Sequence, residues 1–222
     1  MPIPTSNIDA PSVTAVFSSA YLGNVRYYAA MLSNGGMVSI DPCERITKQS
    51  WMHNHCRIVG ANGVQVLTVP VEHLGTAPIL MRDLRIAKHG NWQRVHWGAL
   101  FSAYGKTPFF EYAEDDLRAI YDRQFDWLID FNMALHEMVV EFLDLPLCTT
   151  FNSIDDNYGI DWRGFIGGKK ADTVKEITNI PYYNIWSERH GFIPSLSIID
   201  LMMNCGRESI FILNDMLNTV LI

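Results

Sequence analysis

The residue pattern of the sequence changes close to residue 90, and this change limits the folds that the chain can adopt. Before it, short runs of apolar and β-branched residues are separated by turn residues, which is typical of β-strands. After it, apolar residues recur at intervals of three and four, which is typical of amphipathic helices. Strands followed by helices indicate an α+β fold. We expect a mixed β-sheet in the N-terminal half, covered by a helical layer from the C-terminal half.

The clearest local signal is the dipeptide Asn62-Gly63, which lies between two strand-like runs at residues 49–59 and 65–71. A dipeptide of this kind favours the tight turn of a β-hairpin. The pattern also predicts a short helix at residues 25–32, ended by a pair of glycines. Further strands are predicted at residues 13–20, 37–40, 79–87 and 182–186.

The second half of the chain is predicted to be mostly helical. The predicted helices cover residues 91–104, 108–121, 126–143, 195–205 and 208–217. On the first of them, Trp92, His96, Ala99 and Ala103 share one face. Residues 149–180 have only a weak pattern and are interpreted as loops that include a possible binding loop.

The length and composition are those of one packed domain. The chain has 222 residues, of which 48% are hydrophobic, and this is enough for a sizeable core. Residues 1–12 are expected to form a flexible tail, which leaves residues 13–222 as a single domain. Whether this domain forms a homo-oligomer is left open by the sequence.

The charge and the cysteines argue against several classes of protein. The formal net charge is −7 and Lys and Arg form no run, which argues against binding to nucleic acids or to anionic membrane surfaces. No apolar run reaches the roughly 18 residues of a membrane span. The four cysteines form no C-x-x-C pair, and no secretory signal is recognisable. We therefore expect free thiols and a cytoplasmic protein.

His96 is the most site-like residue, because it lies between Trp92 and Tyr104 on a predicted helix rich in aromatic side chains. Imidazole titrates near neutral pH, so His96 is a candidate general base. The alternative is a histidine that is buried and hydrogen-bonded in the core. Asp200 presents a similar choice, because a carboxylate in an apolar helix is costly to bury unless it is paired or lines a site.

Three further candidates lie on the predicted strand at residues 49–59. His53 and His55 point to one face at a spacing that can chelate a metal, but no third ligand is near in sequence, so no metal site is predicted. Cys56 is a candidate nucleophile if the imidazole of His96 helps to ionise its thiol. An inert, buried thiol is the alternative.

Two basic residues, Lys48 and Arg57, flank the same region. Together with His53 and His55 they are candidates for binding a phosphate or a carboxylate, whereas solvent-facing charge is the plainer interpretation. The common phosphate-loop, dinucleotide and hydrolase motifs are all absent, so the sequence identifies no cofactor.

Four blocks of the sequence, in this order, resemble the WbqC-like protein family, and the resemblance spans about residues 13–210. The blocks are Ala20-Tyr21-Leu22 to Tyr27-Tyr28, then Lys48 to Trp51 with Arg57-Ile58 and Leu67 to Val71, then Trp92 to Tyr104 with Pro108-Phe109-Phe110, and last His190-Gly191-Phe192 with Pro194 to Leu201. The sequence departs from the family pattern at residues 52–56, where alternating Asn and Arg are usual.

The resemblance implies a bacterial protein connected with O-antigen or other surface polysaccharides. It suggests a transferase that moves an acyl or aminoacyl group onto a nucleotide-linked amino sugar. In that role His96 would be the general base and Tyr104 would orient the substrate, with Trp92 and Asp200 beside it, while Lys48 and Arg57 would hold an anionic group. A transferase that depends on the Cys56 thiol and a non-catalytic partner of a biosynthetic enzyme are the alternatives.

Overall fold

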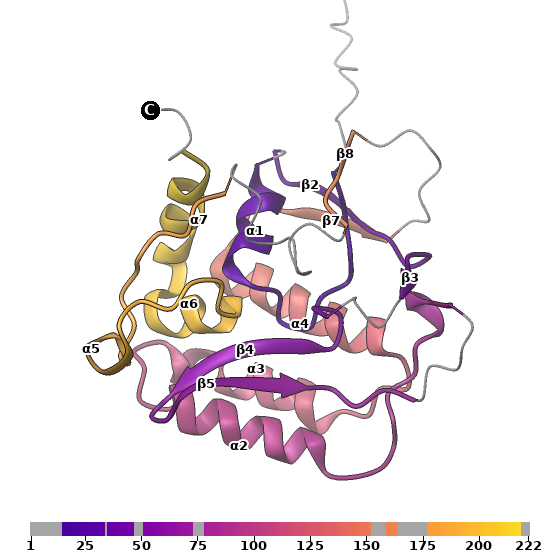
Figure 1. Ribbon diagram of the computed structural model, residues 1–222, viewed down its shortest axis with the longest axis horizontal. Coiled ribbons are helices and arrows are strands. Elements are labelled where there is room, and N and C mark those ends of the chain that lie inside the picture. Colours follow the sequence, from indigo (N-terminus) through magenta and orange to yellow (C-terminus); the bar gives the residue numbers. More distant parts are fainter. Residues whose placement is uncertain are drawn as a thin grey trace, which may run out of the picture.

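The structure is a computed structural model, and it confirms the α+β class (Figure 1). The residues that it describes are 15–33, 35–46, 51–72, 78–151, 159–163 and 177–218. The predicted tail at residues 1–12 and the candidate Lys48 lie outside these ranges. The described strands are distributed over three sheets, which contain four, two and two strands.

The four-stranded sheet is parallel throughout and combines both halves of the chain. Its strands are β1 (Ala15–Phe17), β2 (Met37–Ile40), β7 (Cys148–Phe151) and β8 (Ile160–Asp161), in the order β7-β2-β1-β8. Every side chain of β1 is fully buried, as expected for a central strand of a parallel sheet. The sheet therefore depends on residues that are far apart in the sequence.

Two helices cover the same face of this sheet. They are α1 (Val25–Leu32), which connects β1 to β2, and α4 (Leu128–Leu143), which precedes β7. The Tyr28 hydroxyl of α1 lies 3.2 Å from His136 Nδ1 of α4, and His136 Nε2 lies 2.9 Å from the Thr149 hydroxyl of β7. The asparagine before α1, Asn24, caps that helix by accepting a hydrogen bond from a backbone amide of its first turn.

The predicted hairpin is confirmed and forms a separate two-stranded sheet. Strands β4 (His55–Gly60) and β5 (Gly63–Thr68) pair antiparallel, with Gly60 opposite Gly63. Gly63 has a φ of +97°, which glycine adopts without strain. Helix α2 (Trp92–Tyr104) packs below the hairpin, so a hairpin and not a large mixed sheet lies against this helix (Figure 1).

The other described elements complete the helical part and one short sheet. They are β3 (Arg45–Ile46), β6 (Ile79–Leu80), η1 (Met81–Asp83), α3 (Phe110–Asp122), α5 (Ser187–His190), α6 (Ile198–Cys205), η3 (Gly206–Glu208) and α7 (Ser209–Asn218). The predicted strand at residues 182–186 is wrong. The Asn184 side chain accepts a hydrogen bond from the Trp186 amide, which makes this segment a turn.

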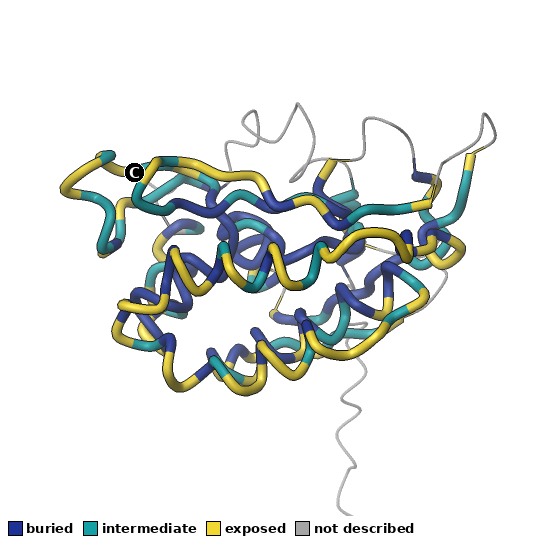
Figure 2. The backbone as a smooth tube through the Cα atoms, turned by 90° about the horizontal axis from the view of Figure 1, so that it is seen from below, coloured by how far each residue is buried: buried dark blue, intermediate teal, exposed yellow. Residues whose placement is uncertain are grey.

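A core of aromatic and aliphatic side chains lies between the parallel sheet and the hairpin. Tyr21, Tyr28, Tyr104, Tyr121 and Phe131 are among its largest fully buried members. Figure 2 shows the outer surfaces of the lower helices as exposed and the segments behind them as buried. In the described parts of the chain, no helix is both long and apolar enough to cross a membrane.

Candidate functional site

The order of the parallel strands locates the candidate site. Numbered by their appearance along the chain, the four strands lie in the order 3-2-1-4, so β2 and β7 lie on one side of β1 and the last strand, β8, lies on the other. In open parallel sheets, ligands bind outside the carboxyl ends of the strands at such a switch point. Here the switch point lies between β1 and β8. The relevant residues therefore follow Phe17, Ile40 and Asp161.

A cluster of charged side chains occupies this edge of the sheet. Arg163 donates two hydrogen bonds to Asp161, at 3.0 and 2.8 Å, and it also pairs with Asp41, which directly follows β2. Ser18, the first residue after β1, donates a hydrogen bond of 2.9 Å to Glu44. We call Ser18, Asp41, Glu44, Asp161 and Arg163 the edge cluster. It joins the ends of three strands.

Acidic side chains outnumber basic ones in the edge cluster, and their pKa values are shifted in opposite directions. Burial raises the pKa of the Glu44 carboxyl, and the bond from Ser18 and the charge of Arg163 offset only part of this rise. Burial also raises the pKa of Asp161, but its hydrogen bonds to Arg163 outweigh that effect and hold it below its usual value. Counting only the side chains of the edge cluster, all of which lie in the described ranges, three carboxyl groups thus accompany one guanidinium group.

Buried polar groups extend the site from β1 towards the hairpin. Asn132 of α4 donates hydrogen bonds to the Ser19 hydroxyl, at 3.0 Å, and to the carbonyl of His53, at 2.8 Å. Among the described residues, Asn132 Oδ1 and His53 Nδ1 have no hydrogen-bond partner. Burial lowers the pKa of His53 to about 4, helped by the nearby His55. His53 is therefore uncharged at neutral pH, with one buried ring nitrogen that has no partner among the described residues.

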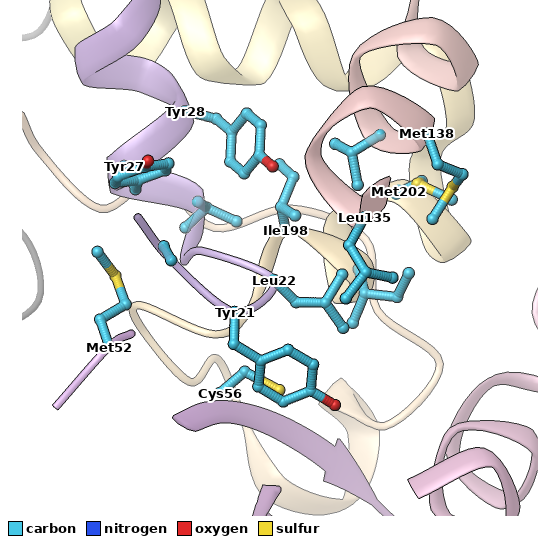
Figure 3. Close-up of a cluster of buried hydrophobic side chains, with 14 of the residues drawn as sticks. Tyr21, Leu22, Tyr27, Tyr28, Met52, Cys56, Leu135, Met138, Ile198 and Met202 are labelled. Carbon is cyan, nitrogen blue, oxygen red and sulfur yellow. The ribbon is translucent and has the colours of Figure 1, made fainter. Parts of the chain in front are cut away.

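The side chains of His96 and Cys56 both contact the hydroxyl of Tyr21. Tyr21 lies in the loop after β1, and its hydroxyl lies 2.8 Å from His96 Nδ1 and is hydrogen-bonded to Tyr121. The same hydroxyl interacts with the Cys56 thiol, and Figure 3 shows this sulfur beside the Tyr21 ring. Trp92 packs edge-on against His96, with ring centroids 5.2 Å apart.

The burial of His96 and Cys56 limits the chemistry of both side chains. His96 is 4% exposed, and burial lowers its pKa to about 4, although a hydrogen bond to the backbone of Thr68 partly opposes this. Burial raises the pKa of the Cys56 thiol well above its usual range. At neutral pH the imidazole and the thiol are therefore both uncharged. This geometry matches the alternative of a hydrogen-bonded core histidine more closely than that of an exposed general base.

Tyr104 and Asp200, two other predicted site residues, lie together at the far end of α2. The fully buried Asp200 accepts hydrogen bonds from Tyr182, at 2.7 Å, and from Asn184, at 2.6 Å, and it also interacts with the Tyr104 hydroxyl. Burial raises the pKa of Asp200 to about 6. Tyr182 and Asn184 also line a cavity of about 10 Å³, which is roughly room for one water molecule.

Arg57 lies apart from both groups. On β4 its side chain alternates with the buried Cys56 and so faces the opposite side, where it is partly exposed. His55 begins the same strand and stacks on Trp51, with ring centroids 5.1 Å apart. Within the described ranges, no three histidine, cysteine or acidic side chains come together as metal ligands.

The comparison with known families covers much of the candidate site. The sequence profile of the WbqC-like protein family matches residues 19–159, which is well over half of the chain. The chain belongs to the WbqC-like protein family. A similar protein, "Uncharacterized protein Rv1507c" of Mycobacterium tuberculosis, is 26% identical over 192 residues, and the match covers 73% of this chain and 81% of that protein. No solved structure matches the chain.

The segment matched by the WbqC-like family contains Asp41, Glu44, His53 and Asn132, but ends before Arg163. Sequence reasoning had found only His53 among these five residues. Asp41 carried a usable signal, because an acidic residue directly after a buried strand of a parallel sheet lies at the ligand-binding edge.

Proposed function

We propose that this WbqC-like protein is a cytoplasmic transferase that places an acyl or aminoacyl group on a nucleotide-linked amino sugar. The proposed place in surface polysaccharide synthesis follows from the family resemblance. The observation that carries the proposal is the edge cluster, in which three carboxyl groups surround one arginine at the switch point of the sheet. A sugar that carries an ammonium group complements this excess of negative charge.

The proposed reaction needs an amine that has lost its proton. Glu44 is suited to accept that proton, because its raised pKa is closer to neutrality than that of an exposed carboxyl. The free amine then attacks the carbonyl carbon of an activated acyl donor such as a thioester. The carbon–nitrogen bond forms, the bond to the leaving group breaks, and the leaving group departs with the electron pair and takes up a proton.

In this proposal His96, Tyr104 and Cys56 act at a distance from the reacting atoms. His96 and Cys56 both contact the Tyr21 hydroxyl, and Tyr21 lies in the loop after β1 that also carries Ser18 and Ser19. His96 and Cys56 are therefore positioning residues for the carboxyl end of β1, whereas Tyr104 contacts Asp200.

Binding measurements on matched ligands test the proposal. A nucleotide-linked amino sugar should bind the wild-type protein about 10-fold more tightly than its N-acetylated form, because only the former carries an ammonium group. Glu44→Gln should remove most of this preference. Asp126→Asn is the matched control, because Asp126 is an exposed carboxylate that pairs with Lys88 at 2.7 Å, outside the edge cluster.

The proposal fails if both sugars bind equally well or if Glu44→Gln and Asp126→Asn behave alike. A wild-type protein that binds the amino sugar but never modifies it, with any acyl thioester supplied, would instead support the non-catalytic alternative. One observation favours that alternative, which is the burial and full hydrogen bonding of His96.

A further inference from the structure

A large groove lies between α3 and α4 and is closed at one end by η3. Its volume is about 970 Å³, at the upper end of the range of ligand sites. Apolar side chains line it on both helices, among them Phe109, Ile120, Met138 and Phe142. None of its lining residues belongs to the edge cluster. The groove is therefore a separate feature, and its role is independent of the proposed transferase activity.

The shape of the groove matches a helical ligand. The lining positions on α3 are 112, 116, 119 and 120, and those on α4 are 134, 137, 138, 141 and 142, so the groove follows both helix axes. From residue 112 to residue 120 the helix rises about 12 Å, which is roughly two turns. A third amphipathic helix that lies along two helices packs its own apolar stripe into such a groove.

The charge of the rim indicates what kind of helix binds. Asp116, Glu137, Glu141 and Glu208 line the groove, and Arg207 is the one basic lining residue in the part of the chain that the structure describes. Glu137, Glu141 and Asp116 are exposed, so their charges are available to a partner. A second copy of this chain is a poor occupant, because its net charge of −7 would repel the same acidic rim.

We propose that the groove between α3 and α4 binds a basic amphipathic helix of another protein. Its apolar stripe lies on Phe109, Ile120, Met138 and Phe142, and its Lys or Arg side chains reach the acidic rim. The apolar contacts supply most of the affinity, while the rim charges set the orientation and raise the association rate.

A designed peptide serves as the probe. A labelled helical peptide of about four turns, with leucine on one face and lysine on the other, should bind the wild-type protein in the micromolar range. A peptide of the same composition with a scrambled order has the same charge but no apolar stripe, and it should bind at least about 10-fold more weakly.

Two double variants and one single variant locate the binding. Glu137→Lys with Glu141→Lys should weaken the helical peptide about 10-fold or more, and Ala134→Trp should obstruct the groove with no change of charge. The double variant Glu111→Lys, Glu114→Lys is the control, because it changes the charge of α3 by the same amount at positions that do not line the groove. It should leave the affinity for the helical peptide within about twofold of the wild-type value.

Three results would overturn the inference. In the first, the scrambled peptide binds as tightly as the helical one, which would mean unspecific attraction to an acidic surface. In the second, spermine displaces the peptide at equal charge concentration, which would make the groove a site for small cations. In the third, both double variants weaken binding equally. Because the amino-sugar assay uses other residues, failure here leaves the result of that assay unaffected.

Discussion

At the scale of single residues, the hydroxyl of Tyr21 is the most connected polar atom near the candidate site. It contacts His96, Tyr121 and Cys56, all of which are buried. Buried polar groups that lose a partner cost more than the bond itself contributes, because they are no longer solvated. His96, Tyr121 and Cys56 thus share this one hydroxyl as a hydrogen-bond partner.

Tyr21→Phe should lower the free energy of unfolding by about 1–3 kcal/mol, because it leaves polar atoms of His96 and Tyr121 without a partner. Denaturant unfolding measures the change. Tyr112→Phe is the control, because Tyr112 is 67% exposed and should change the stability by less than about 0.5 kcal/mol. Equal effects of the two changes would contradict the shared-hydroxyl arrangement.

Asp200 makes the stability depend on pH. Its pKa is raised from 3.8 to about 6 by burial, so the folded protein binds this proton more tightly than the unfolded chain does. The stabilising effect is complete below about pH 4 and is lost as the pH rises through about 6. Between these pH values, the free energy of unfolding of the wild-type protein should fall by about 3 kcal/mol relative to that of Asp200→Asn.

The measurement is denaturant unfolding of both proteins at a series of pH values from about 3.5 to 7. Asp126→Asn should give the opposite trend, because its hydrogen bond to Lys88 lowers the pKa of the Asp126 carboxyl. A stability difference between wild-type protein and Asp200→Asn that does not change with pH would show that Asp200 titrates normally.

The four cysteines are free and differ in burial, so their reactivity tests the thiol-dependent alternative. The exposed Cys148 should react first with iodoacetamide near neutral pH. Cys56 should react only when the protein unfolds, because its thiol is buried and its pKa is raised. Mass spectrometry of the alkylated peptides gives the order. Faster alkylation of Cys56 than of Cys148 would favour a catalytic thiol.

At the scale of elements, the sequence pattern correctly predicted those elements whose bounds are set by residues next to them in the chain. The helix at residues 25–32 and the strand at residues 37–40 have the bounds that the sequence indicated, because a capping asparagine and a glycine pair delimit them. The hairpin was predictable because its turn is encoded by two adjacent residues, Asn62 and Gly63. In each case the signal lies within the element itself.

The strands β7 and β8 were not predicted, because pairing with distant strands creates them. They have four and two residues and are partly exposed, so they carry no clear alternation. Their partners β2 and β1 lie more than 100 residues earlier in the chain. The edge cluster was missed for the same reason, because Arg163 reaches Asp41 only once β8 lies beside β1.

The connection from α4 to β7 gives a prediction about one glycine. A Cβ atom at Gly36 would lie 2.0 Å from the carbonyl oxygen of Pro146, and Gly36 has a φ of +75°. Gly36→Ala should therefore destabilise the protein by more than about 2 kcal/mol. Gly35 has a similar φ of +64°, but the space around its Cβ position is open. Gly35→Ala should therefore cost only the backbone strain, about 1 kcal/mol.

Thermal or denaturant unfolding of the two alanine variants checks this difference. If both substitutions cost the same, the close approach of Pro146 to β2 does not contribute to the stability of the sheet edge.

At the scale of the whole molecule, the two proposed sites are made of different residues. The edge cluster lies where strands from both halves of the chain meet, and the acidic groove lies between two helices on other residues. Histidine 96, which sequence alone made the first candidate, belongs to the packed interior that connects the hairpin, α2 and the loop after β1. Burial is what distinguishes His96 from the residues of the edge cluster and the groove. No local sequence pattern reports burial reliably.

β8 meets β1 through only two residue pairs, and Arg163, the second residue after β8, pairs with Asp41 at the end of β2. Few paired residues mean a low free energy of local opening, so hydrogen exchange at the amide of Trp162, which bonds to Val16, should be faster than at the amides of β2. Each opening event would also separate Arg163 from Asp41. The carboxyl group of Asp41 would then alternate between a paired and an unpaired state each time this short strand opens, on the timescale of local unfolding.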